Sequence, residues 1–129
     1  MADLTLSQFI ETVRLVCDQS NLVVSYDVRV LDNAVVKIRV FLTDAAFIGL
    51  YFNPANDNCS YALVRNSQRI YGADNAFVGW HVHPFESPDD HRLCEPVPFG
   101  EFLGRVERWM RQRDHSPTTE RGSPITDDQ

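Results

Sequence analysis

Apolar side chains recur every three or four positions in residues 4–18, and polar side chains occupy most of the positions between them. This spacing is typical of an amphipathic helix that buries one face. Asp3 and Thr5 are the candidate N-caps, because a short oxygen-bearing side chain can accept a hydrogen bond from a free amide of the first turn. The apolar stripe consists of Leu6, Phe9, Ile10, Val13, Val16 and Cys17.

After residue 20 the pattern changes to an alternation of apolar and polar positions, which is the period of a β-strand. Asp32-Asn33 separates the first two alternating runs and suits a tight turn between antiparallel strands. Successive short runs with turns between them predict an antiparallel meander of five to six strands that follows the N-terminal helix. The predicted strands are 21–32, 33–44, 45–53, 59–66, 69–72 and 76–84.

The alternation also assigns each side chain to one of the two faces of the sheet. The even-numbered positions of 33–44 are largely apolar, whereas the odd-numbered positions include Lys37 and Arg39. In the last run, His81 and His83 share one face and apolar side chains occupy the other. We therefore expect one apolar face, and a second face of mixed polarity that is free to form a site.

A second amphipathic helix is predicted at 99–113, directly after Pro96 and Pro98. We expect it to pack beside the first helix on the apolar face, which gives a two-layer α+β domain over residues 1–113. Residues 114–129 lack periodicity and are rich in polar side chains, so we predict a disordered acidic tail. The apolar stripe of the second helix consists of Phe99, Phe102, Leu103, Val106, Trp109 and Met110.

Charge changes this picture in one respect. The chain of 129 residues has 12 basic and 18 acidic side chains, a net charge of −6, and so lacks the overall basicity of a nucleic-acid-binding protein. However, residues 114–129 contain four of the acids and one Arg, which leaves fourteen acids and eleven bases in the predicted domain. A nearly balanced domain can carry a local basic face.

The cysteines and the hydropathy pattern predict the environment of the protein. Cys17, Cys59 and Cys94 are odd in number and widely spaced, and the opening MADLTLSQF lacks the pattern of a secretory signal. We therefore expect a reduced, cytoplasmic location. No apolar run approaches the roughly 20 residues that a bilayer-spanning helix needs, so no membrane association is expected.

Residues 74–91 (DNAFVGWHVHPFESPDDH) concentrate three histidines and four carboxylates. His81 and His83 are two apart on a predicted strand, so both point to the same face with Cα atoms roughly 6.5–7 Å apart. This spacing suits two ligands of one metal ion, and Zn²⁺ is the cofactor that this alternative predicts. The candidate third ligands are His91, Asp89, Asp90 and Cys94.

The His-x-His-Pro sequence of this strand also resembles the metal-binding strand of the JAMM metalloproteases, in which a Ser and an Asp follow. Here Ser87, Asp89 and Asp90 lie in that region, but the interval from His83 to the Asp is shorter than in that family. The family also has a catalytic Glu on an earlier strand. In this chain the Glu before the segment is Glu11, which lies in the predicted N-terminal helix.

A second interpretation needs no cofactor. His81 and His83 can act as general base and general acid, as RNA cleavage through the 2′-hydroxyl requires, with Asp74 as the group that orients an imidazole. The reaction also needs cations near the developing phosphorane charge, and we assign Arg69 and Arg65 to this role. Further cations on the predicted strands are Arg29, Lys37 and Arg39.

RNA recognition commonly uses aromatic side chains that stack on unpaired bases. We assign Tyr61 and Trp80 to stacking, and Asn75 to RNA binding beside them. A structural alternative remains open for each of these residues. Tyr61 and Trp80 also suit a core, Asp74-Asn75 suits a turn whose side chains cap local amides, and the histidines can hydrogen-bond the loop that follows them.

The order of features in 61–103 resembles the TumE-like family, whose members are regarded as toxin components of toxin–antitoxin pairs. The shared features are a Tyr-containing strand, a short Arg-Ile-Tyr strand, Asp-Asn-Ala, a His-x-His-Pro strand, and a proline-bracketed entry into a helix. One departure is that members often carry histidines soon after Asp-Asn-Ala, where this chain has Phe77-Val78-Gly79-Trp80. The resemblance marks as motif positions Asp74, Asn75, His81 and His83, with Tyr61 and Arg69 as weaker matches.

The sequence therefore supports three hypotheses. The first is a toxin of a two-gene module that acts as a metal-independent ribonuclease or another RNA-directed enzyme, with a cognate antitoxin protein as its partner. The second is a non-enzymatic protein-binding module. The third is a metal-dependent hydrolase with His81, His83 and His91 as ligands. The oligomeric state and the molecular target are left open.

Overall fold

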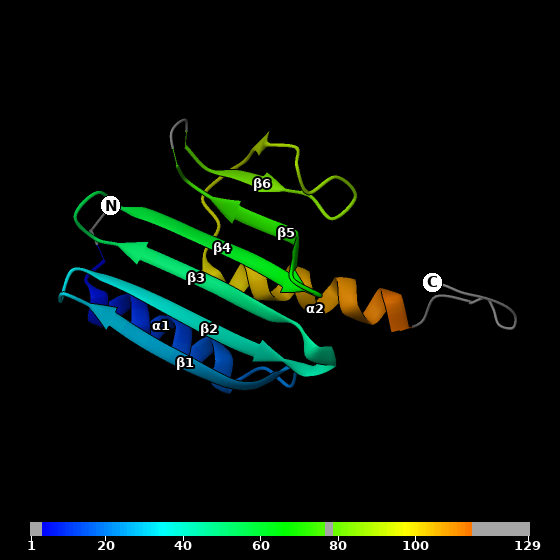
Figure 1. Ribbon diagram of the computed structural model, residues 1–129, viewed down its shortest axis with the longest axis horizontal. Helices are drawn as coiled ribbons and strands as arrows, with labels where there is room; N and C mark the ends of the chain where they lie inside the picture. Colours follow the sequence, from blue (N-terminus) through cyan, green and yellow to red (C-terminus); the bar gives the residue numbers. More distant parts are fainter. Residues whose placement is uncertain (1–3, 77–78, 115–129) are drawn as a thin grey trace, which may run out of the picture.

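The computed structural model describes residues 4–76 and 79–114, and within these ranges the chain forms two helices and one seven-stranded antiparallel sheet. Figure 1 looks onto the uncovered face of the sheet, with both helices behind it. The predicted α+β architecture is confirmed. The elements are α1 (Leu6–Asp18), β1 (Val23–Leu31), β2 (Val35–Leu42), a short 3-10 helix (Thr43–Ala45), β3 (Phe47–Asn53), β4 (Asn58–Arg65), β5 (Gln68–Asp74), β6 (His81–His83), β7 (Arg92–Leu93) and α2 (Phe99–Asp114).

Helix α1 begins with a capping box. The Thr5 hydroxyl accepts from the Gln8 amide at 3.1 Å, and the Gln8 side chain accepts from the Thr5 amide at 2.9 Å. Two amides that the helix leaves without partners are thereby satisfied. Thr5 is therefore the N-cap, and Asp3, the other candidate, lies outside the described residues, as does the tail over residues 115–129.

Each strand pairs with its neighbours in the sequence, in the order β1 to β7. The tightest turn places Asn66 and Ser67 between β4 and β5, with φ angles of 53° and 63°. A two-residue antiparallel turn requires this left-handed backbone at both positions, and Asn tolerates it better than most residues. Polar residues therefore make these turns without glycine.

The predicted number of five to six strands is too low, because the sheet has seven. The last predicted strand, 76–84, contributes only His81–His83, since Asp74 Oδ1 accepts from the Ala76 amide in a local turn and Gly79 has a φ of 104°. Strand β7 was not predicted, because two residues carry no periodicity. Strands β6 and β7 therefore extend the sheet beyond β5 and place the histidine segment at its edge.

The core lies between the helices and one face of the sheet. The even-numbered side chains of β2 are buried there, as the alternation predicts. Phe9 of α1 stacks on Phe52 of β3 at 4.5 Å between ring centroids, and Phe102 of α2 contacts the rings of Tyr61 and Tyr71 at 5.0 and 5.1 Å. The two helices thus cover one face and leave the other uncovered. None of the helices in the described ranges has the length and hydropathy of a membrane span.

The buried thiols predict an alkaline loss of stability. Burial raises the pKa of Cys17 and of Cys59 from 9.0 to about 11. Above pH 9 the unfolded chain releases these protons while the folded chain retains them. The thiols therefore make their full contribution to the free energy of unfolding below pH 9, and this contribution is lost as the pH rises towards 11. For Cys59 the complete loss is roughly 3 kcal/mol.

We expect the Cys17→Ala/Cys59→Ala variant to lose less stability over this pH interval than the wild type. Urea unfolding at a series of pH values measures the difference. The readout is the slope with pH, since the truncations lower stability at every pH. Some loss remains in the variant, because burial also raises the pKa of Tyr61 and of Cys94. Equal slopes would contradict the assignment.

Candidate functional site

The cross-strand register brings the candidate residues together on the uncovered face. Tyr51, Ser60, Asp74 and His81 are successive partners across β3, β4, β5 and β6. Gly72 pairs with His83 two residues along the same two strands, and therefore on the same face. Because directly paired side chains lie on the same face, the register alone places Asp74 beside His81 and diagonal to His83.

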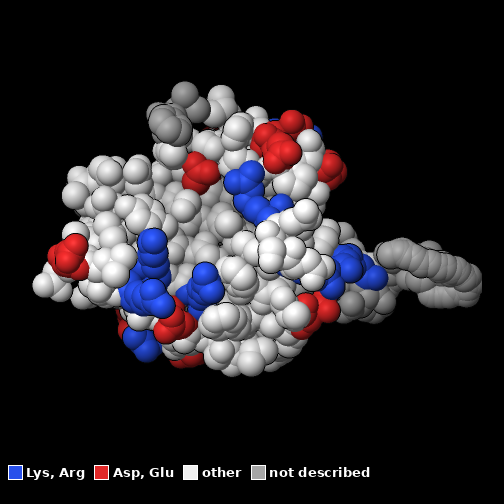
Figure 2. Space-filling model, viewed as in Figure 1, with Lys and Arg blue, Asp and Glu red and all other residues white. Residues whose placement is uncertain are grey.

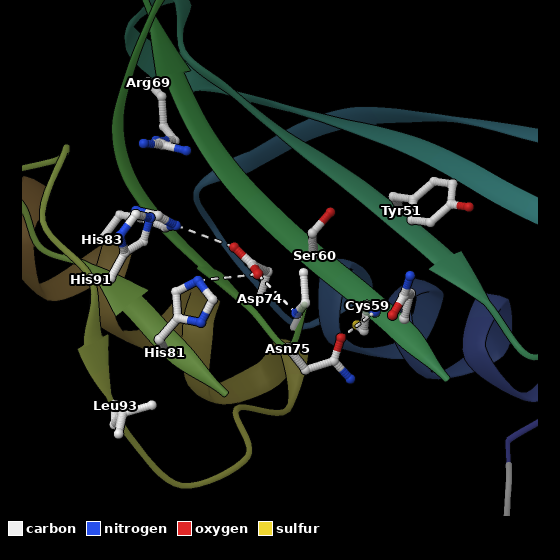
Figure 3. A pocket seen from close by; sticks show the side chains of 12 residues that line it. Tyr51, Cys59, Ser60, Arg69, Asp74, Asn75, His81, His83, His91 and Leu93 are labelled. Carbon is white, nitrogen blue, oxygen red and sulfur yellow. Dashed lines mark hydrogen bonds and ion pairs between the residues drawn. The ribbon is translucent and has the colours of Figure 1, made fainter. Parts of the chain in front are cut away.

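The Asp74 carboxylate lies between two imidazole rings (Figure 3). Its Oδ1 is 3.2 Å from Nε2 of His81, and its Oδ2 is 3.2 Å from Nε2 of His83. Oδ1 also accepts a hydrogen bond of 3.0 Å from the Ala76 amide. The turn that ends β5 therefore fixes the carboxylate, and the carboxylate in turn orients both histidines.

His81 has an oxygen beside each ring nitrogen. Its Nδ1 is 3.1 Å from the Gly79 carbonyl oxygen, while Nε2 contacts the Asp74 carboxylate. A neutral imidazole carries one N–H and can donate to only one of these two acceptors. Both contacts are favourable together only when a second proton or a metal ion supplies positive charge at the ring. The ring is buried, with 7% of the residue exposed. Burial increases the free-energy cost of a ring nitrogen that faces an oxygen acceptor without a proton between them.

His83 is buried more deeply, and its ring nitrogens differ in environment. Nε2 is paired with Asp74, whereas Nδ1 is buried and has no hydrogen-bond partner among the described residues. The backbone under the ring is Gly72, where an added Cβ would lie 3.4 Å from Cδ2 of His83 and 3.3 Å from Cδ of Arg69. The absence of a side chain at this position lets both groups approach the sheet closely.

His91 comes from the loop before β7 and completes a cluster of three imidazoles. Its ring centroid is 5.1 Å from that of His81 and 4.5 Å from that of His83. One nitrogen of each ring lies within 4.8 Å of one nitrogen of each other ring, a spacing at which the three rings could hold a metal ion. Of the four third ligands predicted from sequence, His91 is the one in this cluster; Asp89, Asp90 and Cys94 do not belong to it.

These groups border a cavity of about 730 Å³ on the uncovered face of β3 to β7. Arg69 lines it and donates a hydrogen bond of 2.9 Å to the Pro88 carbonyl oxygen, which ties β5 to the histidine loop. Cys59 also lines it, but burial raises the pKa of its thiol to about 11. The thiol stays protonated near neutral pH and is therefore neither a nucleophile nor an anionic ligand.

Asn75 lines the cavity but has structural partners. Its side-chain carbonyl oxygen accepts from the Cys59 amide at 2.9 Å, and its amide nitrogen donates to the Asp57 carbonyl oxygen at 2.7 Å. Both contacts bind the end of β5 to the start of β4. The turn-forming alternative for Asp74-Asn75 therefore describes Asn75 well, because its polar groups are engaged by the backbone.

Three of the predicted RNA-binding residues lie away from this cavity. Tyr61 points into the core, with 4% of the residue exposed and its hydroxyl donating to the Val97 carbonyl oxygen. Trp80 packs on the Tyr61 ring with centroids 6.0 Å apart, and Arg65 pairs with Asp44 at 2.6 Å. Stacking of an RNA base on Tyr61 is incompatible with this burial, so we do not retain the role; Trp80 and Arg65 are likewise not brought to the histidines.

The structure adds two residues that the sequence had not singled out. Tyr51 and Ser60 line the cavity beside Asp74. Tyr51 pairs with Ser60, and Ser60 pairs with Asp74, so the cross-strand register places both residues on the same face as Asp74. Without the register, neither residue differs from other polar strand positions.

Comparisons of the chain with protein-family models, with curated proteins and with solved structures gave no match. The function of the site is therefore inferred from its own geometry.

Two glycines on this face provide a matched test of the packing. An alanine methyl at Gly72 would meet the Tyr61 carbonyl oxygen at 3.2 Å, as well as Arg69 and His83, whereas a methyl at Gly49 meets only Phe47 at 3.9 Å. We expect Gly72→Ala to lower the free energy of unfolding by on the order of 1–3 kcal/mol and to shift the His83 ring signals in NMR spectra. Gly49→Ala should change neither the His83 signals nor, beyond a small gain, the stability. Unchanged His83 signals in Gly72→Ala would contradict the close approach.

Proposed function

We propose that the cluster of His81, His83, His91 and Asp74 is the centre of a metal-dependent hydrolase that cleaves RNA phosphodiesters. The observation that carries this proposal is the position of His81 between two oxygen acceptors, beside two further imidazoles. His81, His83 and His91 would hold a divalent cation, with the Asp74 carboxylate beside it, and the ion would supply the positive charge that both His81 contacts require. The Gly79 carbonyl would then accept from Nδ1–H, an arrangement common for the second nitrogen of a metal-bound histidine.

The ligand types favour a particular class of ion. Imidazole nitrogens suit Zn²⁺ and its neighbours in the first transition series, whereas Mg²⁺ and Ca²⁺ prefer oxygen ligands. A site with three histidines can leave a position open for water or substrate, which is typical of catalytic rather than structural zinc. The ion would supply a nucleophile at neutral pH and stabilise charge on a phosphate oxygen.

The residues of the chain have separate tasks in this proposal. Asp74 orients the imidazoles and balances the charge of the ion. Arg69 lines the same cavity, and its exposed guanidinium can donate to a phosphate through the N–H groups that do not bind Pro88. The buried faces of His81 and His83 keep bulk water away from the ligand atoms.

A specific observation favours a second candidate, a metal-free ribonuclease. Nε2 of His81 lies 3.2 Å from Oδ1 of Asp74, so this ring has the orienting carboxylate that an acid/base imidazole requires. Because the Nδ1 atom of His83 is buried, the ring that is accessible for proton transfer in this scheme is that of His91, which is exposed. His91 replaces His83 as the predicted partner of His81 in this alternative.

The role as a toxin rests on the resemblance to the TumE-like family. A toxin that must be silent during growth needs a tightly bound antitoxin, and the exposed Arg108 on α2 offers one contact to an acidic segment of such a partner. The neighbouring Arg105 is already engaged, since it donates to the Tyr71 hydroxyl at 3.1 Å and pairs with Glu101. If the protein cleaves no RNA, the hypothesis of a non-enzymatic protein-binding module replaces the enzyme.

Metal analysis separates the two enzymatic candidates. Protein purified without a polyhistidine tag should bind one equivalent of Zn²⁺ by calorimetry, and His91→Ala should weaken the affinity at least tenfold because it removes a ligand. The matched control is Asp89→Ala, which removes an exposed carboxylate of the same loop that lies outside the cluster. Full RNA cleavage in the presence of a strong chelator would refute the metal proposal and support the metal-free alternative.

Growth after induced expression tests the toxin proposal. We expect the wild type and Asp89→Ala to arrest growth, and His81→Ala/His83→Ala to permit it, because the double variant removes two groups of the centre. Soluble yield and circular dichroism establish that the variants are folded. Normal growth with all three proteins, without an antitoxin present, would be evidence against a toxin.

A further inference from the structure

A continuous row of paired residues leads across the uncovered face to the histidine cluster. Arg29, Lys37, Tyr51, Ser60 and Asp74 are successive cross-strand partners from β1 to β5. Successive strands lie about 4.8 Å apart, so Lys37 on β2 is roughly 14 Å from the Asp74 position on β5. The cations of β1 and β2 and the histidine cluster therefore belong to one surface.

The neighbouring cross-strand row has small residues at its central positions. These positions are occupied by Gly49, Ala62 and Gly72; His83 ends the row on one side, and Arg39 and then Asp27 of β1 end it on the other. At Gly49 an added Cβ would meet only the Phe47 ring, at 3.9 Å. A trough thus runs across the strands, and the row that contains Lys37, Tyr51 and Ser60 borders it on one side.

Two hollows lie along this trough. One is the cavity of about 730 Å³ at the histidines, which Tyr51 lines, and the other, of about 370 Å³, lies over β1 and β2 and is lined by Lys37 and Arg39 among others. Lys37, which lines the second hollow, and Tyr51, which lines the first, are direct cross-strand partners. Figure 2 shows basic side chains over the β1 and β2 part of this face, with acidic side chains beside them.

The cations of β1 and β2 are unusually placed for a protein with a net charge of −6. Arg29 and Lys37 face each other directly across two strands, an arrangement that destabilises a sheet. Among the described residues, none of the carboxylates lies within ion-pair distance of Arg29, Lys37 or Arg39. Arg39 lies instead over the Phe47 ring at 4.8 Å. An anionic ligand would relieve the repulsion.

We propose that this trough binds extended single-stranded RNA and delivers it to the histidine cluster. The inference rests on the proposed function, since it names the substrate form of that site. Lys37 and Arg39 contact phosphates, and Tyr51, which is half-buried at the edge of the cavity, stacks on an unpaired base. A duplex offers no unpaired base to Tyr51, so the single strand is the preferred form.

The test measures binding without turnover. A fluorescent 2′-O-methyl oligonucleotide of about ten nucleotides is titrated with the full chain in EDTA, so that neither a metal-dependent nor a 2′-hydroxyl reaction proceeds. We expect Lys37→Glu/Arg39→Glu to weaken binding more than tenfold. Arg108→Glu/Arg14→Glu, which makes the same charge change on the helices, should weaken it less than threefold. The neutral variant Lys37→Gln/Arg39→Gln should lower the slope of log affinity against log salt by about 1.4.

A substitution at the trough floor separates binding from folding. An added Cβ at Gly49 makes no close contact and valine favours the strand conformation, so we expect Gly49→Val to maintain or raise the melting temperature. It should nevertheless weaken oligonucleotide binding severalfold by filling the trough. Tyr51→Leu should cost roughly tenfold in affinity, and Tyr51→Phe should cost little.

The outcomes distinguish this inference from the proposed function. Binding that depends on Lys37 and Arg39, without RNA cleavage under any metal condition, supports the trough and rejects the proposed enzyme. RNA cleavage with an unchanged KM in Lys37→Glu/Arg39→Glu and in Gly49→Val overturns the trough and leaves the enzyme standing. Equal affinity for duplex RNA, or selective binding of polyglutamate in place of the oligonucleotide, also overturns it, and the latter assigns the face to an acidic protein.

Discussion

The alternation of side chains along paired strands is the constraint on which this structure depends. Both helices cover the same face of a seven-stranded sheet, so β2, β3 and β4 send alternate side chains into the core and the others to an uncovered surface. Nearest-neighbour pairing then aligns residues that are far apart in sequence. Lys37 and His81 occupy one cross-strand row because Tyr51, Ser60 and Asp74 pair in succession between them. A shift of one residue in β5 would turn Asp74 into the core and separate the histidines from their carboxylate.

The sequence was sufficient for the parts of the fold that have a period. It predicted both helices, the meander, and the common face of His81 and His83. It also indicated that this face is the one left free by the helices. The same alternation could have excluded Tyr61, which shares its face with the apolar Cys59 and Leu63 rather than with Ser60.

Contacts between non-periodic segments could not be predicted in this way. His91 reaches the cluster through a loop, and the course of that loop depends on β7 and on the bond from Arg69 to the Pro88 carbonyl. Arg65 is removed from the site by Asp44, whose position depends on the turn before β3. These are long-range outcomes of packing, and a single sequence contains no local signal for them.

The histidine cluster lies at the shortest strands of the sheet. Strand β6 has three residues and β7 has two, whereas β2 to β4 have seven or eight and cover the buried core. Few backbone hydrogen bonds therefore need to break for this corner of the sheet, formed by β6 and β7, to separate from β5. Such an opening leaves the remaining strands intact. We therefore expect the histidine cluster and the core to open as separate cooperative units. A ligand shared by His81, His83 and His91 would tie β6 to the loop before β7, so occupancy of the cluster would be coupled to the local order of the corner rather than to the global stability of the fold.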